Sequence, residues 1–230
     1  MDANKIFRKN LDANKILNYP NKNQTDLSFQ DFSANIKNLS FLKEGWRGKI
    51  FVGFFNEKKV AIKVAKSFHL IQNIRKEAEI LRQVNEKNIG PKIILSGSDF
   101  FVMEFIDGIP FKKILDEVNT LSDLFFDILY QARELDRMKI SKNEMHKPYN
   151  NVIFCEKEKR VVLIDFESSQ FTEKPKNVTQ FVSFLISFLK SKGRIYPQEE
   201  KTAIELMRNY KKDYSDENFR KLLNFLKNFS

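Results

Sequence analysis

Hydrophobic and polar positions follow two different periods along the chain. From Leu39 onward, short apolar runs alternate with polar positions and are bounded by glycine, asparagine or serine, which is typical of β-strands. The runs read LSFLKE, KIFVGFF, KKVAIKVA, KIILSG and DFFVMEF. After Gly108 the apolar residues recur every three to four positions, as they do on one face of an amphipathic helix. The pattern therefore predicts a sheet-rich part followed by a helix-rich part.

Five helices are predicted, and one of them lies inside the sheet-rich part. Apolar residues with helical spacing, from Leu70 to Leu81, predict a helix over residues 70–85. The other four helices are predicted over residues 121–138, 178–189, 198–211 and 215–228. Between the first two of these four, VIFCE and RVVLIDF form a predicted hairpin joined by the charged turn KEK.

These elements predict an α+β fold with two lobes. Residues 39–106 would form a small antiparallel sheet with one helix, and residues 107–230 a reduced, mainly helical lobe. We expect a cleft between the lobes. Residues 1–38 are polar and carry DANKI twice, so we assign them to an N-terminal extension that is helical or loosely docked.

The composition indicates a folded protein and excludes several classes. Hydrophobic residues make up 42% of the chain and 23 residues are Phe, which favours a buried core. No apolar run has the length of a membrane span and no signal peptide is visible, so a cytoplasmic protein without membrane contact is predicted. Cys155 is the only cysteine, which excludes an internal disulfide, and His and Cys show no metal-site spacing.

The charge balance widens the range of expected partners. The chain has 40 basic and 30 acidic residues and a net charge of +10, which favours encounters with ATP, nucleic acid or an acidic partner protein. Lysine-rich surfaces are also common without such partners. RNA association is therefore only weakly supported.

The stretch VAIK, Val60 to Lys63, has the chemistry of a nucleotide site. Side chains alternate across a strand, so Ala61 and Lys63 are predicted to face one side and Val60 and Ile62 the other. The small Ala61 leaves room for a flat ring, and an ammonium group can reach phosphates. A lone lysine of this kind is more often a solvated strand residue, so its partner decides the interpretation.

Glu77 is the predicted partner of Lys63. At about 100° per residue, Glu77 falls within the apolar stripe of its helix, whereas Glu79 points roughly 200° away from it. A carboxylate that faces inward needs a partner. Lys63 is the natural candidate, and Glu79 is interpreted as a solvated charge.

A glycine pair precedes this strand. In KEGWRGKIFVG, Gly45 and Gly48 are followed by Ile50, as in the last two glycines of the phosphate-covering loop G-x-G-x-x-G-x-V. Lys43 stands where that pattern has its first glycine. Glycine matters here because backbone amides must approach the phosphates closely.

The combined motifs resemble the protein kinases over about residues 39–190. FVMEFIDG resembles the last strand and hinge, which implies that Met103 is the gatekeeper and that the backbone of Glu104 and Ile106 faces the adenine edge. NIGPKII and VMEFIDGIP are similar to small atypical kinases of the RIO and KEOPS-associated kind, in particular a group of predicted archaeal serine/threonine kinases. The resemblance implies a bilobal, protein-kinase-like fold.

The same resemblance implies a magnesium site. Asp165 in VVLIDFE resembles the metal-binding aspartate of DFG, with Phe166 as the packing residue, and Asn151 resembles the catalytic-loop asparagine that binds a second metal. Glu167 departs from the pattern, because glycine is expected there. An ordinary polar strand end is the alternative interpretation of Asp165.

The aspartate expected in the catalytic loop is missing. By the spacing H-R-D-L-x-x-x-N, counted back from Asn151, His146 takes the aspartate position and Glu144 the histidine position. The archaeal group instead resembles H-G-E-L-H-R-P-x-x-N, and KNEMHKPYNN matches it without gaps. In that register Glu144 takes the acid's role, His146 is the competing base, and Lys142 replaces the usual histidine. Lys147 is either a neutralising charge near the γ-phosphate or a solvated lysine.

The sequence therefore predicts an atypical, ATP- and Mg²⁺-dependent serine/threonine kinase that acts on itself or on a folded protein partner. Catalysis would combine positioning and electrostatics, with Lys63 on the phosphates. No A-P-E motif follows Asp165, which makes broad peptide phosphorylation doubtful. Two alternatives stay open: a nucleotide-binding pseudokinase or regulatory module, and a small-molecule or RNA-linked kinase or ATPase.

Overall fold

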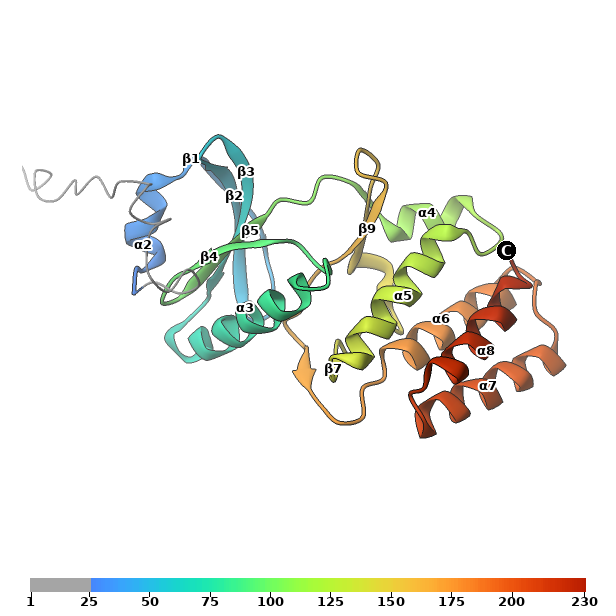
Figure 1. Ribbon diagram of the computed structural model, residues 1–230. Coiled ribbons are helices and arrows are strands. Elements are labelled where there is room, and N and C mark those ends of the chain that lie inside the picture. The colour runs from blue at the N-terminus through green and yellow to red at the C-terminus, as the bar shows by residue number, and fades with distance from the viewer. Residues whose placement is uncertain (1–25) are drawn as a thin grey trace, which may run out of the picture. The chain divides into compact units, whose positions relative to one another are not determined.

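The structure is a computed structural model that describes residues 26–230, which form an α+β fold (Figure 1). These residues divide into two compact units. The first unit contains residues 26–78 and 93–105, and the second contains residues 79–92 and 106–230. The DANKI repeat lies outside the described residues.

The first unit is built on a five-stranded antiparallel sheet in the order β1-β2-β3-β5-β4. The strands are β1 (Lys37–Glu44), β2 (Gly48–Phe55), β3 (Lys58–Ala65), β4 (Ile93–Ser96) and β5 (Phe100–Glu104). Each strand falls within one of the five apolar runs, or begins just before it. The prediction of a small antiparallel sheet is therefore confirmed.

Helix α3 (Ile71–Asn85) runs along one face of this sheet (Figure 1). It begins one residue later than predicted because residues 68–70 form a 3-10 turn. The apolar stripe is buried as expected, Glu77 is buried within it, and Glu79 is exposed. The helix belongs to the first unit through Ala78 and to the second unit from Glu79 onward.

A short N-terminal segment covers the opposite face of the sheet, where the sequence predicted only a helical or loosely docked extension. Helix α2 (Phe29–Phe32) and a following 3-10 turn (Ser33–Asn35) place the fully buried Phe32 in a cluster with Val60 and Ile62 of β3. The ring centroid of Phe32 lies 4.8 Å from that of Phe100. This part of the assigned N-terminal extension thus belongs to the hydrophobic core.

Hydrogen bonds hold the α2 segment in place. The backbone N–H of Phe29 donates to Oδ1 of Asp99 at 2.8 Å, and the backbone N–H and Oγ of Ser98 donate to the carbonyl of Leu27 at 2.9 and 3.1 Å. Asp99, which accepts, and Ser98, which donates, both lie in the turn between β4 and β5. The segment and that turn therefore support each other.

The second unit combines two small sheets with five helices. The sheets have the orders β6-β8-β9 and β10-β7, and β8 pairs with β9 as the predicted hairpin. The strands are β6 (Ile109–Pro110), β7 (Ile140–Ser141), β8 (Val152–Cys155), β9 (Arg160–Leu163) and β10 (Gln170–Phe171). The helices are α4 (Phe111–Glu117), α5 (Asp123–Arg137), α6 (Asn177–Ser191), α7 (Pro197–Lys212) and α8 (Asp216–Lys227). Four of these helices were predicted; α4, with only seven residues, was not.

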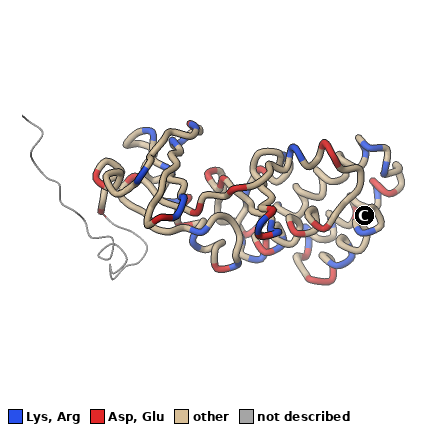
Figure 2. Tube along the Cα trace, turned by 90° about the horizontal axis from the view of Figure 1, so that it is seen from above, with Lys and Arg blue, Asp and Glu red and all other residues tan. Residues whose placement is uncertain are grey.

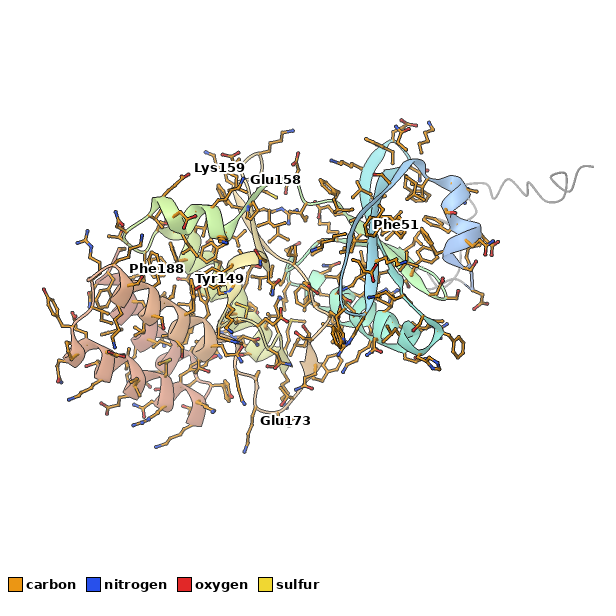
Figure 3. All side chains as sticks on the ribbon, turned by 180° about the vertical axis from the view of Figure 1, so that it is seen from behind. Phe51, Tyr149, Glu158, Lys159, Glu173 and Phe188 are labelled. Carbon is orange, nitrogen blue, oxygen red and sulfur yellow. The ribbon has the colours of Figure 1, made fainter. Side chains whose placement is uncertain are left out.

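Phenylalanine rings form much of the core of the second unit. Phe125 on α5 packs against Phe188 on α6, and Phe111 on α4 packs against both Phe125 and Phe184. Tyr149 meets the edge of Phe184 at 5.6 Å between ring centroids, and both Tyr149 and Phe188 are labelled in Figure 3. Burial of each such ring stabilises the fold by about 1.5–3 kcal/mol.

No helix within residues 26–230 is both long enough and apolar enough to cross a membrane.

Candidate functional site

Lys63 and Glu77 form a buried ion pair in the first unit. The Nζ atom of Lys63 lies 2.8 Å from Oε1 and 2.7 Å from Oε2 of Glu77, and the two side chains are only 4% and 5% exposed. The contact predicted from helical spacing is therefore present. A buried pair of this kind is weak evidence for stability, because desolvation of both charges offsets much of their attraction. The pair does hold the ammonium group in one position.

An apolar strip lies beside this ammonium group on the same face of the sheet. Ile50 of β2 is paired with Lys63, and Ala61 is paired with Val52 on one side and Met103 on the other. Directly opposed residues of antiparallel strands point to the same face. The strip therefore combines a small buried Ala61 with three half-buried apolar side chains.

Val52 is the member of this strip that the sequence reasoning missed. It lies two residues after Ile50 and shares its face, so strand alternation contained the signal. Three of the predicted cofactor-binding residues, Ile50, Ala61 and Met103, are brought together on neighbouring strands. Glu104 ends β5 and Ile106 is the first residue of the second unit after it, and their backbone role stays a prediction.

The glycine pair forms a tight turn between β1 and β2. The backbone N–H of Gly45 donates to the carbonyl of Gly48 at 2.8 Å. A Cβ atom at Gly48 would lie 3.0 Å from the carbonyl oxygen of Val64 and 3.1 Å from Cγ of Lys63. Such contacts are tighter than most real ones, so glycine lets β2 pass close to the stem of Lys63. Lys43, in place of the first glycine, lies in β1 opposite Ile50.

Asp165 follows β9 in a conformation that is rare for residues other than glycine. Its φ is +62° and its side chain is exposed. The buried Lys142 donates from Nζ to the backbone carbonyl of Asp165 at 2.8 Å, and the next residue, Phe166, is buried. A left-handed backbone persists where neighbouring groups hold it, and such strain is concentrated at functional sites. Buried side chains on both sides thus hold the Asp165 carboxylate at the surface.

Glu144 and Asn151 contact each other beside Asp165. The Nδ2 group of Asn151 donates a short hydrogen bond to Oε2 of Glu144. The carbonyl of Asn151 accepts from the N–H of Ile164 at 2.8 Å, which places Asn151 next to the residue before Asp165. The structure therefore brings three predicted residues of the second unit together.

His146 and Lys147 are exposed on the same turn. The N–H of Lys147 donates to the carbonyl of Glu144 at 3.0 Å. Met145, which lies between Glu144 and His146 in the sequence, is buried. Of the two candidates for the missing aspartate, Glu144 is the one that contacts Asn151. His146 stays the competing base.

The sequence reasoning missed two polar residues behind this loop. Asn177, fully buried at the start of α6, accepts a hydrogen bond at 2.7 Å from the backbone N–H of Lys142. Asp136, buried at the end of α5, accepts from Nδ2 of Asn177 at 2.8 Å, and burial raises its pKa above the ordinary value. A polar residue inside an otherwise apolar helical stripe was the available signal for both.

Asp165 and Asn151 have the donor types that Mg²⁺ prefers. Within residues 26–230, no group of three or more His, Cys, Asp or Glu side chains could hold a metal ion. Mg²⁺ usually binds through one or two carboxylates together with waters and substrate phosphates. Asn151 donates its amide N–H to Glu144, which leaves the amide oxygen as the metal-binding atom. An exposed carboxylate and an amide oxygen therefore fit this ion.

No protein-family model matches the chain, and no curated protein matches it either. The resemblance to protein kinases therefore rests on the motifs and contacts described above.

Proposed function

We propose that the chain is an atypical, protein-kinase-like phosphotransferase. It transfers the γ-phosphoryl group of ATP to a hydroxyl group, either on itself or on a folded protein partner. The observation that carries this proposal is the buried ion pair of Lys63 and Glu77 beside an apolar strip. An ammonium group held in this way next to a flat apolar surface suits a ligand with an aromatic base and phosphates.

In this proposal, the first unit binds the nucleotide. Ala61, Val52 and Met103 contact the adenine ring, because their sheet face is apolar and Ala61 leaves space. Lys63 binds the α- and β-phosphates, with Glu77 fixing its direction. Backbone amides of the turn from Gly45 to Gly48 then approach the phosphates.

The second unit supplies the oxygen ligands. Asp165 and Asn151 would hold Mg²⁺, which neutralises charge on the phosphates when it is bound. Lys142 keeps Asp165 exposed through its hydrogen bond to the backbone carbonyl, and Glu144 orients the amide group of Asn151. Side chains fixed by such hydrogen bonds would lower the cost of reorganisation during the reaction.

The transfer itself is a displacement at phosphorus. The acceptor hydroxyl oxygen attacks the γ-phosphorus, the bond from that phosphorus to the β–γ bridging oxygen breaks, and ADP leaves. The proton of the hydroxyl passes to Oε1 of Glu144, since Oε2 accepts from Asn151. His146 is the competing base.

The segment after Asp165 favours a folded acceptor. Between Phe166 and Lys176 the chain forms β10, which pairs with β7, and the N–H of Thr172 donates to the carbonyl of Lys139 at 2.8 Å. Lys139 also forms an ion pair with Glu173, at 2.6 Å. Because residues 166–176 are short and are held by this strand pairing, hydrogen bond and ion pair, they offer little surface for binding an extended peptide.

One contact favours a second candidate, a nucleotide-binding regulatory module without turnover. The hydrogen bond from Asn151 engages Oε2 of Glu144, which leaves Oε1 as the only carboxylate oxygen without that bond for a substrate hydroxyl. Lys and Arg are interspersed with Asp and Glu along the described parts of both units (Figure 2).

Incubation with γ-labelled ATP and Mg²⁺ tests the proposal. The informative variants are Lys63→Met, Glu144→Gln and Asp165→Asn, and the matched controls are Lys58→Met, an exposed lysine on the same strand, and Glu79→Gln. Label on the wild-type protein or an added partner, lost in the three variants and kept in the controls, supports the kinase. ATP consumption without protein label indicates a small-molecule or RNA-linked enzyme. Nucleotide binding without turnover indicates the regulatory module.

A further inference from the structure

A buried polar network lies behind the loop that carries Glu144. At its centre is Asp136, which is 4% exposed and accepts four hydrogen bonds. Two come from Asn177, at 3.0 Å from its backbone N–H and 2.8 Å from Nδ2. The others come from the N–H of Val178 at 3.2 Å and from the hydroxyl of Tyr210 on α7 at 2.9 Å. One carboxyl group therefore joins the ends of α5, α6 and α7.

Asn177 connects this carboxyl group to the catalytic loop. Its Oδ1 accepts from the backbone N–H of Lys142 at 2.7 Å, and its Nδ2 also donates to the backbone carbonyl of Ile140 at 2.6 Å. The side chain thus holds the backbone on both sides of Ser141. Because Asn177 is fully buried, water cannot replace these bonds without local opening.

Lys142 forms hydrogen bonds with the backbone of both acidic residues of the candidate site, Asp165 and Glu144. Its Nζ donates to the carbonyl of Asp165 at 2.8 Å, and its own carbonyl accepts from the N–H of Glu144 at 2.6 Å. A continuous series of hydrogen bonds therefore runs from Tyr210 through Asp136 and Asn177 to this loop.

The network is a costly way to stabilise a core. A buried carboxyl group and a buried amide are each tolerated only when their hydrogen bonds are made, and apolar side chains would fill the space more favourably. Burial also raises the pKa of Asp136, because desolvation disfavours its charged form. Such groups fix one arrangement of the backbone rather than add stability.

We infer that Asp136 and Asn177 are positioning residues that set the backbone from Ile140 to Glu144, and that Tyr210 makes helix α7 a structural part of the candidate site. The consequence for catalysis rests on the proposed function, whereas the positioning of the loop does not. Helix α7, which contributes no predicted site residue, would thus help to position the loop that carries Glu144.

The test uses Asp136→Asn and Tyr210→Phe in the full chain. Tyr210→Phe removes a single hydroxyl, so it remains informative if Asp136→Asn fails to fold. Tyr130→Phe is the matched control, because it deletes the same atom from a half-exposed tyrosine on α5. The first readout is hydrogen exchange of the Lys142 amide without nucleotide, since that N–H donates directly to Asn177.

We expect the Lys142 amide to exchange about tenfold faster or more in both variants, with little change in the strands of the first unit. We expect kcat of phosphoryl transfer to fall by about 10–100-fold with KM for ATP nearly unchanged, since the adenine strip lies in the first unit. Unchanged exchange at Lys142, or faster exchange with wild-type kcat, overturns the inference. A wild-type protein without turnover overturns the proposed function instead, and the exchange result alone then decides the positioning role.

Discussion

The buried ammonium group of Lys142 donates a hydrogen bond to the backbone carbonyl of Asp165, 2.8 Å away. The contact joins the loop that carries Glu144 to the residue with a left-handed backbone. Lys142 occupies the position at which the resembling kinases have histidine, and the structure thus gives this departure a physical role. Asp165 is held by a side chain 23 positions earlier in the chain.

Loss of the Lys142 ammonium group should impair catalysis more than folding. We expect Lys142→Met to lower phosphoryl transfer by about tenfold or more, because Asp165 loses the donor that holds its backbone. The apolar replacement fits a buried position, so the free energy of unfolding should change by less than about 2 kcal/mol. Activity assays and urea unfolding measure the two effects, with the exposed Lys157→Met as control. Full activity in Lys142→Met would refute the role.

The ion pair of Lys63 and Glu77 can be separated into its stabilising and functional parts. Glu77→Leu leaves a buried lysine without its carboxylate, so we expect it to lower the free energy of unfolding by about 3–5 kcal/mol. The double variant Lys63→Met/Glu77→Leu should regain most of that stability, within about 1 kcal/mol of wild type. It should not regain ATP binding, as measured by calorimetry. A double variant that binds ATP normally would make the pair purely structural.

Glu144 and His146 can be distinguished by their amide variants. Glu144→Gln keeps the shape but cannot take a proton, so we expect kcat to fall by about 100-fold or more. His146→Gln should change kcat by less than about tenfold, because His146 is exposed and Glu144 is the residue in contact with Asn151. Steady-state kinetics with saturating ATP decides between them. A larger fall in kcat for His146→Gln than for Glu144→Gln would identify His146 as the base.

The pH dependence of stability should report the ionisation of Asp136. Burial raises its pKa above the ordinary value of 3.8. Between that value and the raised one, the folded protein binds more protons than the unfolded chain, so stability falls as the pH rises. Asp136→Asn cannot ionise, and we expect its deficit in unfolding free energy to shrink as the pH rises from about 4 upward. Urea unfolding across this range measures the difference, and a constant deficit would contradict the expectation.

The α2 segment should contribute strongly to the stability of the first unit. Phe32 is fully buried against β3, so Phe32→Ala should lower the free energy of unfolding by about 3–5 kcal/mol. Phe41, whose side chain is 57% exposed, provides the control, and Phe41→Ala should cost less than about 1 kcal/mol. Thermal unfolding of both variants gives the comparison. Equal effects would mean that α2 adds nothing to the core.

Local periodicity predicted the five strands of the first unit, the hairpin of β8 and β9, and most helices, because apolar residues recur in them at strand or helix spacing; the two-residue strands β6, β7 and β10 were not predicted. It also placed Glu77 on the inward side of α3 and so predicted its contact with Lys63. The common face of Ala61 and Lys63 followed from strand alternation, whereas Gly45, Gly48 and Ile50 were identified by their resemblance to the phosphate-covering loop of protein kinases. Spacing along a strand or helix determines the direction of a side chain, which is why the first kind of prediction was possible.

The unpredicted features depend on contacts between distant parts of the chain. Asp136 and Asn177 are 41 positions apart, and although each falls within an apolar stripe, the pattern of one helix does not show which distant residue its polar side chain contacts. Phe29 and Phe32 form too short an apolar pattern to predict a helix, and their burial depends on β3 and β5. Burial of Lys142 could not be predicted either, because lysine is almost always exposed.

Helix α3 changes from the first compact unit to the second between Ala78 and Glu79, and the chain changes unit twice more, after Lys92 and after Phe105. Neither unit is therefore one uninterrupted stretch of sequence. A single cut cannot separate the two units cleanly, because any continuous stretch that contains one unit whole also contains residues of the other, and a break at Ala78 would divide a continuous helix. A fragment made to carry the whole sheet of the first unit must therefore also carry residues 79–92 of the second.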